Sequence, residues 1–308
     1  MLLVAVAYVV LSGRLAAAPV WVDDRGYGLP GVGALGLSPL WSAIVNAAAN
    51  LGIMTLMVMV NKAYNVLRAI TWLMVGLFAL MQAAVPVQCT TLNPGTLLCL
   101  CIAACTYMML GCYGQPGRTR TVFLVFLILG AGCAVQYAFT PFILVFWLML
   151  VQMRIFSART FLASLLGILC AWILLMGSGT VSPADINWPH LSGLPDDIGL
   201  NRGFYRIAVA AITALLLLGA LMANAYKTIS YNARARAYNG ALVVLALVTV
   251  IAMALDSDNL ATYLPLLNMS AAYQITHYFV NHRYDRQYIA VLAIAGVYVA
   301  LYIWRILP

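Results

Sequence analysis

Glutamate is missing from this chain, and charge of either sign is scarce. All 8 acidic residues are Asp, and charged residues make up 8% of the 308 positions, whereas a soluble domain carries about 25%. Hydrophobic residues make up 65% of the sequence. So few charges exclude a soluble globular protein. We expect an all-α, polytopic transmembrane helix bundle that forms a single integral-membrane domain over residues 1–308.

Several catalytic and metal-binding patterns are also missing. The sequence has no Walker loop, no His-Glu-x-x-His zinc motif and no Gly-x-Ser-x-Gly nucleophile motif. Six of the seven cysteines lie in apolar runs, where a free thiol behaves as a small hydrophobe, so they predict neither a disulfide framework nor a metal site. No loop carries a dense basic run, which argues against nucleic acid as a partner. The net charge of +8 instead fits contact with anionic membrane lipids.

The few charges alternate in sign along the chain. Basic residues fill every second gap between apolar segments: Lys62 and Arg68, Arg118 and Arg120, Arg154 and Arg159, Lys227 with Arg234 and Arg236, and Arg283 with Arg286. The gaps between them contain Asp23 and Asp24, then Asp185, Asp196 and Asp197, then Asp256 and Asp258. Short loops rich in Lys and Arg stay in the cytoplasm. The pattern therefore predicts a bacterial inner-membrane protein with its N-terminus inside, its C-terminus outside and seven of its eight carboxylates on the outer face.

Apolar segments of helical length predict about eleven spans. We expect them at 2–20, 39–60, 67–86, 96–113, 121–138, 141–153, 160–177, 203–224, 238–255, 260–280 and 287–305. The apolar stretch 121–153 is divided at Thr140-Pro141, because the basic residues on both of its sides require an even number of crossings between them.

Asp23 and Asp24 directly follow the first expected span, at the outer membrane surface. A carboxylate there could act as general base on a sugar hydroxyl, or could bind a divalent cation that holds a pyrophosphate. Alternatively, Asp24-Arg25-Gly26 forms a solvated turn in which the guanidinium neutralises the acid.

Arg202 and Arg206 are bases at the outer end of the eighth expected span, against the trend of the chain. Their spacing of four places both on one helix face. Since guanidinium groups bind phosphate in bidentate fashion, the pair could hold a lipid phosphate or pyrophosphate. Extension of both side chains into the head-group layer is the alternative.

A second long outer loop carries further acids and a histidine. They are Asp185, His190, Asp196 and Asp197. These residues could form the second half of the same site, or could lie in a solvated loop interrupted by proline.

Polar side chains inside the expected spans must face protein or water rather than lipid. Asn46 and Asn50 are one helical turn apart, and Asn268 is expected near mid-depth, where it could bridge helices. His277 and His282 are expected near the inner end, either as a proton relay or as interface residues.

Three segments carry a resemblance to known proteins: Asn61-Lys-Ala-Tyr-Asn-Val-Leu-Arg68, Leu92-Asn-Pro-Gly95 and Thr160-Phe-Leu-Ala-Ser-Leu-Leu-Gly167. They resemble an uncharacterised family of multi-pass inner-membrane proteins of Bacteroidota. The layout is also similar to the membrane part of GT-C glycosyltransferases, whose first outer loop carries a catalytic acid and whose sugar donor is linked to a lipid phosphate. Asp23 and Asp24 occupy the matching place, although the first outer loop is short and no large outer domain follows at the C-terminus.

The resulting hypothesis is a protein of envelope biogenesis that acts on a polyprenyl-phosphate-linked substrate at the outer face, by GT-C-like glycosyl transfer. Its catalytic residues would be Asp23 and Asp24, and its phosphate-binding residues Arg202 and Arg206. Two alternatives remain open: a non-enzymatic subunit that scaffolds a larger membrane complex, and a small transporter.

Overall fold

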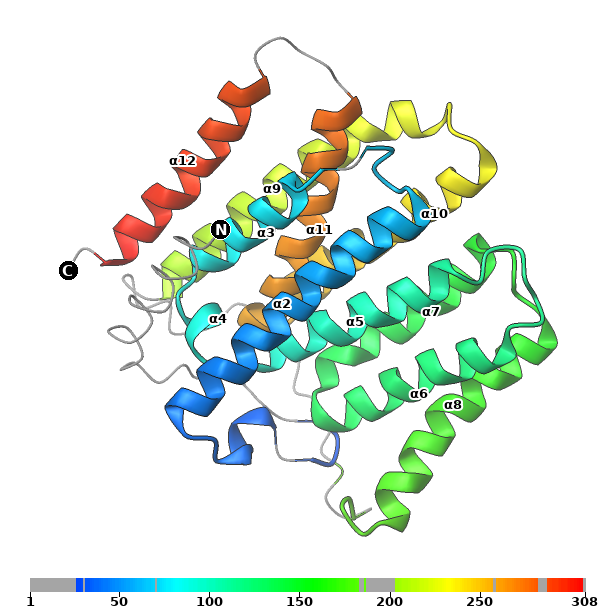
Figure 1. Cartoon of the computed structure of the whole chain (residues 1–308). Helices are drawn as coiled ribbons and strands as arrows, with labels where there is room; N and C mark the ends of the chain where they lie inside the picture. The colour runs from blue at the N-terminus through cyan, green and yellow to red at the C-terminus, as the bar shows by residue number, and fades with distance from the viewer. Residues whose placement is uncertain are drawn as a thin grey trace.

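The computed structural model describes residues 26–29, 31–69, 71–182, 186, 203–256, 259–281 and 287–306. Within these residues the chain is helical and contains no strand (Figure 1). The elements are η1 (Val32–Leu35), α2 (Pro39–Tyr64), α3 (Leu73–Ala83), α4 (Val87–Thr90), α5 (Pro94–Leu110), α6 (Thr119–Val135), η2 (Tyr137–Phe139), α7 (Thr140–Gln152), α8 (Ala158–Gly177), α9 (Gly203–Thr228), α10 (Ala233–Leu255), α11 (Leu260–Asn281) and α12 (Gln287–Ile306).

Five of these helices are long and apolar enough to cross a membrane: α2, α8, α9, α10 and α12. Helices α3, α5, α6 and the η2–α7 segment are apolar but shorter. The all-helical, membrane-embedded class predicted from composition is therefore confirmed. The number of about eleven spans stays a prediction.

Helix starts follow from local capping chemistry. Ser38, Asn93 and Asn232 each accept a hydrogen bond from the backbone of the first turn of α2, α5 and α10. Ser157 and Thr160 form a reciprocal capping box at the start of α8. The predicted division at Thr140-Pro141 is confirmed, because α6 ends at Val135 and α7 begins at Thr140.

The predicted span at 67–86 is shorter than expected, and the structure gives the reason. The side chain of Asn61 accepts from Leu67 N at 2.9 Å and donates to Ala69 O at 2.9 Å. These bonds hold residues 65–69 in a turn, with Asn65 and Arg68 at positive φ. Helix α3 consequently begins only at Leu73, and Pro86 separates it from the short α4.

Helix α11 lies inside the bundle, in contact with α3, α5, α9 and α10 (Figure 1). Its residues from Thr262 to His277 are all buried. Helices α6 and α8 pack most closely, because a Cβ on Gly130 would lie 3.0 Å from Ile168 Cα and one on Gly167 2.5 Å from Phe123 O. Small residues that allow backbones to approach this closely are typical of helix packing in membranes.

The turns that carry the basic residues contact one another at one end of the bundle. The Arg68 guanidinium lies 3.7 Å from the ring centroid of Tyr231, and that of Arg234 lies 5.8 Å from the ring centroid of Tyr113. Lys227 Nζ donates to Asn281 O at 2.5 Å, which joins the ends of α9 and α11. This basic end lies at the upper right of Figure 1. We call the opposite end of the bundle, where α10 ends at Leu255 before Asp256, the acidic end.

Candidate functional site

Asp256 is the one acidic residue in the described part of the chain, and it is buried with 4% of its surface exposed. It caps the C-terminus of α10, where its backbone N–H donates to Ala252 O at 2.9 Å. Its carboxylate accepts hydrogen bonds from Asn259 Nδ2 at 3.0 and 3.1 Å and from Tyr263 Oη at 3.2 Å. Asn259 Nδ2 also donates to Tyr137 Oη. We call these four residues the Asp256 cluster.

The first described segment of the chain docks beside this cluster. Tyr27 N donates to Cys133 O at 3.3 Å, and Leu29 N donates to Ala134 O at 3.0 Å. Thr140 Oγ1 donates to Tyr27 Oη at 3.3 Å. Gly26 lies so close to the end of α6 that a Cβ there would collide with the backbone carbonyl of Ala134. The segment 26–29 is thereby fixed to the junction of α6 and α7, from which Tyr137 also projects.

The Asp256 cluster can hold a negative charge in a fixed place at the acidic end. A buried carboxylate is costly unless it is hydrogen-bonded, and here two side-chain donors from α11 and its preceding turn supply those bonds. In return the carboxylate orients the amide of Asn259 and the hydroxyl of Tyr263. Among the described residues, no group of three His, Cys, Asp or Glu side chains could bind a metal ion.

The predicted site residues fall largely outside the described residues. Asp23, Asp24 and Arg202 do so, as do the residues of the second acidic loop, Asp185, His190, Asp196 and Asp197. Arg206 is described: it is half-buried on the first turns of α9, at the acidic end. The convergence of Asp23 and Asp24 with Arg202 and Arg206 in one cavity therefore stays a prediction.

The polar residues predicted to face the bundle do so, and they form a continuous amide network. Asn268 Nδ2 donates to Gln82 Oε1 at 3.0 Å, and Gln82 Nε2 donates to Asn50 Oδ1 at 3.2 Å. Asn50 Nδ2 donates to Asn46 O at 3.0 Å, and Asn46 Nδ2 donates to Gln88 O at 2.9 Å. All five side chains are buried. The expectation that Asn268 bridges helices is confirmed, since the network joins α2, α3, α4 and α11.

His277 lies near the basic end of α11, as expected. Its Nε2 is 3.2 Å from Tyr231 Oη, and the ring of Tyr231 in turn lies under the Arg68 guanidinium. This contact joins α11 to the turn between α9 and α10, which favours the interface role over a relay. His282 lies outside the described residues.

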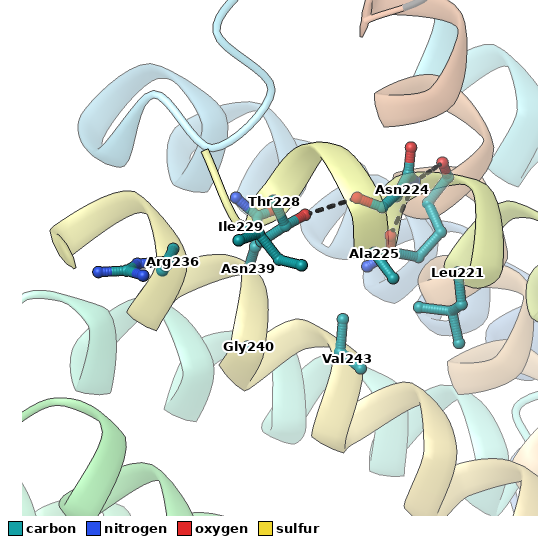
Figure 2. A pocket seen from close by; sticks show the side chains of 10 residues that line it. Leu221, Asn224, Ala225, Thr228, Ile229, Arg236, Asn239, Gly240 and Val243 are labelled. Carbon is teal, nitrogen blue, oxygen red and sulfur yellow. Dashed lines mark hydrogen bonds between the residues drawn. The ribbon is translucent and has the colours of Figure 1, made fainter. Parts of the chain in front are cut away.

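A cavity of about 260 Å³ lies near the basic end, between α9 and α10 (Figure 2). Its walls include Asn224 and Thr228 from α9, Asn239 and Arg236 from α10, and Gln274 from α11. Apolar side chains, among them Leu221 and Val243, complete the lining.

Sequence reasoning counted Asp256 as a loop acid and missed its burial. The available signal was the spacing Asp256, Asn259 and Tyr263, which places polar partners three and seven residues after the acid. The cavity between α9 and α10 had no such signal, because its lining comes from three helices.

No family model, curated protein or solved structure matches this chain. Its function is therefore argued from its own residues.

Proposed function

We propose that this chain is a multi-pass membrane protein of envelope biogenesis that acts on a lipid-linked substrate at the acidic end of the bundle. The charge pattern assigns that end to the outer face. The observation that supports the proposal is the docking of segment 26–29 beside the Asp256 cluster. Asp24 precedes Gly26 by two residues in the sequence, so a fixed segment there would restrain the carboxylate pair that the sequence predicts at the outer membrane surface.

The chemistry that this arrangement would support is glycosyl transfer from a polyprenyl-phosphate donor. Asp23 or Asp24 would accept the proton of the acceptor hydroxyl, whose oxygen would attack the anomeric carbon. The bond from that carbon to the donor phosphate would break, and the phosphate oxygen would leave with the electron pair. Arg202 and Arg206 would neutralise the leaving phosphate, and a divalent cation bound by the second Asp could share that role. Asp256 would act as a positioning residue.

Complementation of a deletion strain tests the proposal. Asp23→Asn, Asp24→Asn and the double variant should be inserted at normal levels, and the double variant should fail to rescue the strain and should let the lipid-linked donor accumulate. Asp285→Asn is the matched control, because it makes the same change between Arg283 and Arg286, in a segment predicted to lie on the cytoplasmic side. It should rescue fully. Full rescue by the double variant would remove the proposed site.

A membrane scaffold is the second candidate, and an exposed apolar stripe on α8 offers a surface for a partner helix. Leu162, Leu166, Leu169 and Ile173 follow one another at helical spacing and are each more than half exposed. Such a stripe faces either lipid or a partner helix. Rescue by the double Asp variant, together with loss of rescue when Leu166 and Leu169 are both changed to Ala, would decide for the scaffold.

A further inference from the structure

The cavity between α9 and α10 changes in polarity along its length. Arg236 and Ile229 lie nearest to the basic turn between the two helices, Thr228 and Asn239 follow, and Leu221 and Val243 are deepest along the helices. Arg236 and Val243 are seven residues apart on α10, which corresponds to about 10 Å along the helix axis. The cavity thus has a charged mouth at Arg236, a polar middle at Thr228 and Asn239, and an apolar floor at Leu221 and Val243. A membrane phospholipid has its charged, polar and apolar parts in the same order.

Positive charge gathers at the mouth. Arg236 is exposed there, and Figure 2 shows its guanidinium turned outward beyond the rim. Lys227 lies one residue before Thr228, and its ammonium lies at the same end, against Asn281 O. Within the described residues no carboxylate lies at this end, because Asp256 is 20 residues and about 30 Å further along α10. Among the described residues, an anionic group at the mouth therefore meets bases and no carboxylate.

A buried acceptor in the cavity wall lacks a donor. Asn224 is 3% exposed, and its Nδ2 donates to the O and Oε1 of Gln274 at 2.9 and 3.1 Å. Its Oδ1 has no hydrogen-bond partner in the described protein. An unsatisfied buried acceptor is costly, and it makes the wall polar at the depth between Thr228 and Leu221. Free inorganic phosphate would leave the apolar floor at Leu221 and Val243 uncovered.

We propose that this cavity is a specific site for an anionic phospholipid, taken from the leaflet that faces the basic end. The phosphate lies at Arg236, the glycerol and ester groups lie beside Thr228 and Asn239, and an acyl chain covers Leu221 and Val243. The site is independent of the proposed activity at the Asp256 end.

Native mass spectrometry of the full chain in detergent tests the site, with dioleoyl phosphatidylglycerol and dioleoyl phosphatidylcholine as probes. The wild type should retain phosphatidylglycerol preferentially. Arg236→Gln should weaken its retention by roughly fivefold, the effect of one surface base on an anionic lipid. Ala225→Phe should remove binding of the lipid, because Ala225 lines the cavity and is exposed, so that the ring fills it without displacing core packing.

Arg159→Gln is the matched control: Arg159 is an exposed base at the same end that does not line the cavity. It should change retention by less than about twofold, since only the lost long-range charge acts. Equal retention of the two lipids, equal loss in Arg159→Gln and Arg236→Gln, or full binding by folded Ala225→Phe would each overturn the proposal. If Ala225→Phe does not elute as a folded species, the comparison of the two arginine variants decides.

Discussion

Asn268 Nδ2 donates a hydrogen bond to Gln82 Oε1 at 3.0 Å, and this contact joins α11 to α3 across 186 residues of sequence. Both side chains are buried, so the bond fixes the position of α11 relative to α3. It also continues through Gln82 to Asn50 on α2. Three helices therefore depend on one chain of amide side chains.

The first prediction concerns the strength of that bond. Asn268→Leu should destabilise the protein only modestly, because Asn268 Oδ1 has no partner in the described protein and a single hydrogen bond is lost. A double-mutant cycle with Gln82→Leu should give a coupling of about 0.6 kcal/mol, as for other interhelical hydrogen bonds in membranes. Thermal unfolding in detergent measures it. The control combines Asn268→Leu with Ser164→Ala on α8, two distant changes whose effects on the free energy of unfolding should add. A coupling near zero between Asn268→Leu and Gln82→Leu would contradict the structure.

The second prediction concerns the buried carboxylate. Asp256→Asn should be mild, since the new amide oxygen can still accept from Asn259 or Tyr263. Asp256→Leu should cost more, about 1–3 kcal/mol for each donor left unpaired. The free energies of unfolding of the two variants give the test. Greater stability in Asp256→Leu than in the wild type would mean that burial of the charge costs more than its hydrogen bonds return.

The helix positions could largely be predicted from the sequence, because apolar runs bounded by proline, glycine and charge leave little choice. Helix α8 was expected at 160–177 and runs from Ala158 to Gly177. The burial of Asn46 and Asn50 also followed, since an amide cannot face hydrocarbon without a partner.

The remaining features depend on contacts between distant segments. The shortening of α3 comes from one side chain, Asn61, that binds the backbone of the following turn. The burial of Asp256 requires Asn259 to meet Tyr137, which is 122 residues away in the chain. Periodicity cannot supply such pairings, because it reports only which face of a helix is apolar.

The third prediction concerns the docked segment. Gly26→Ala should displace residues 26–29 from the end of α6, because the added methyl would collide with the backbone carbonyl of Ala134, which cannot rotate away. Chymotrypsin should then cleave at Tyr27 faster than in the wild type. Gly219→Ala in α9 is the control, since a Cβ there meets nothing within 4 Å and alanine favours a helix by about 0.5–1 kcal/mol. Equal cleavage rates in wild type and Gly26→Ala would show that the segment is not held at this position.

The fourth prediction concerns topology. The turns that carry Arg68, Arg118, Arg154 and Arg234 lie at one end of the bundle, so a single assignment of that end orients the whole chain. Reporter fusions after Arg120, Arg159 and Arg236 should all read cytoplasmic, and a fusion after Asp197 should read periplasmic. Paired fusions to green fluorescent protein and alkaline phosphatase at each site provide the control, because only one of each pair is active on a given side.

The fusions after Arg120 and Arg159 carry particular weight, because they enclose α6, η2 and α7 with the first turn of α8. The structure breaks this stretch at Gln136, so the chain leaves and returns to the same end, and both reporters must agree. Opposite readings at these two sites would mean that 121–153 crosses as one continuous segment, against the observed break. Periplasmic readings at both sites, combined with a cytoplasmic reading after Asp197, would invert the outer assignment of the Asp256 end, and with it the proposed side of action.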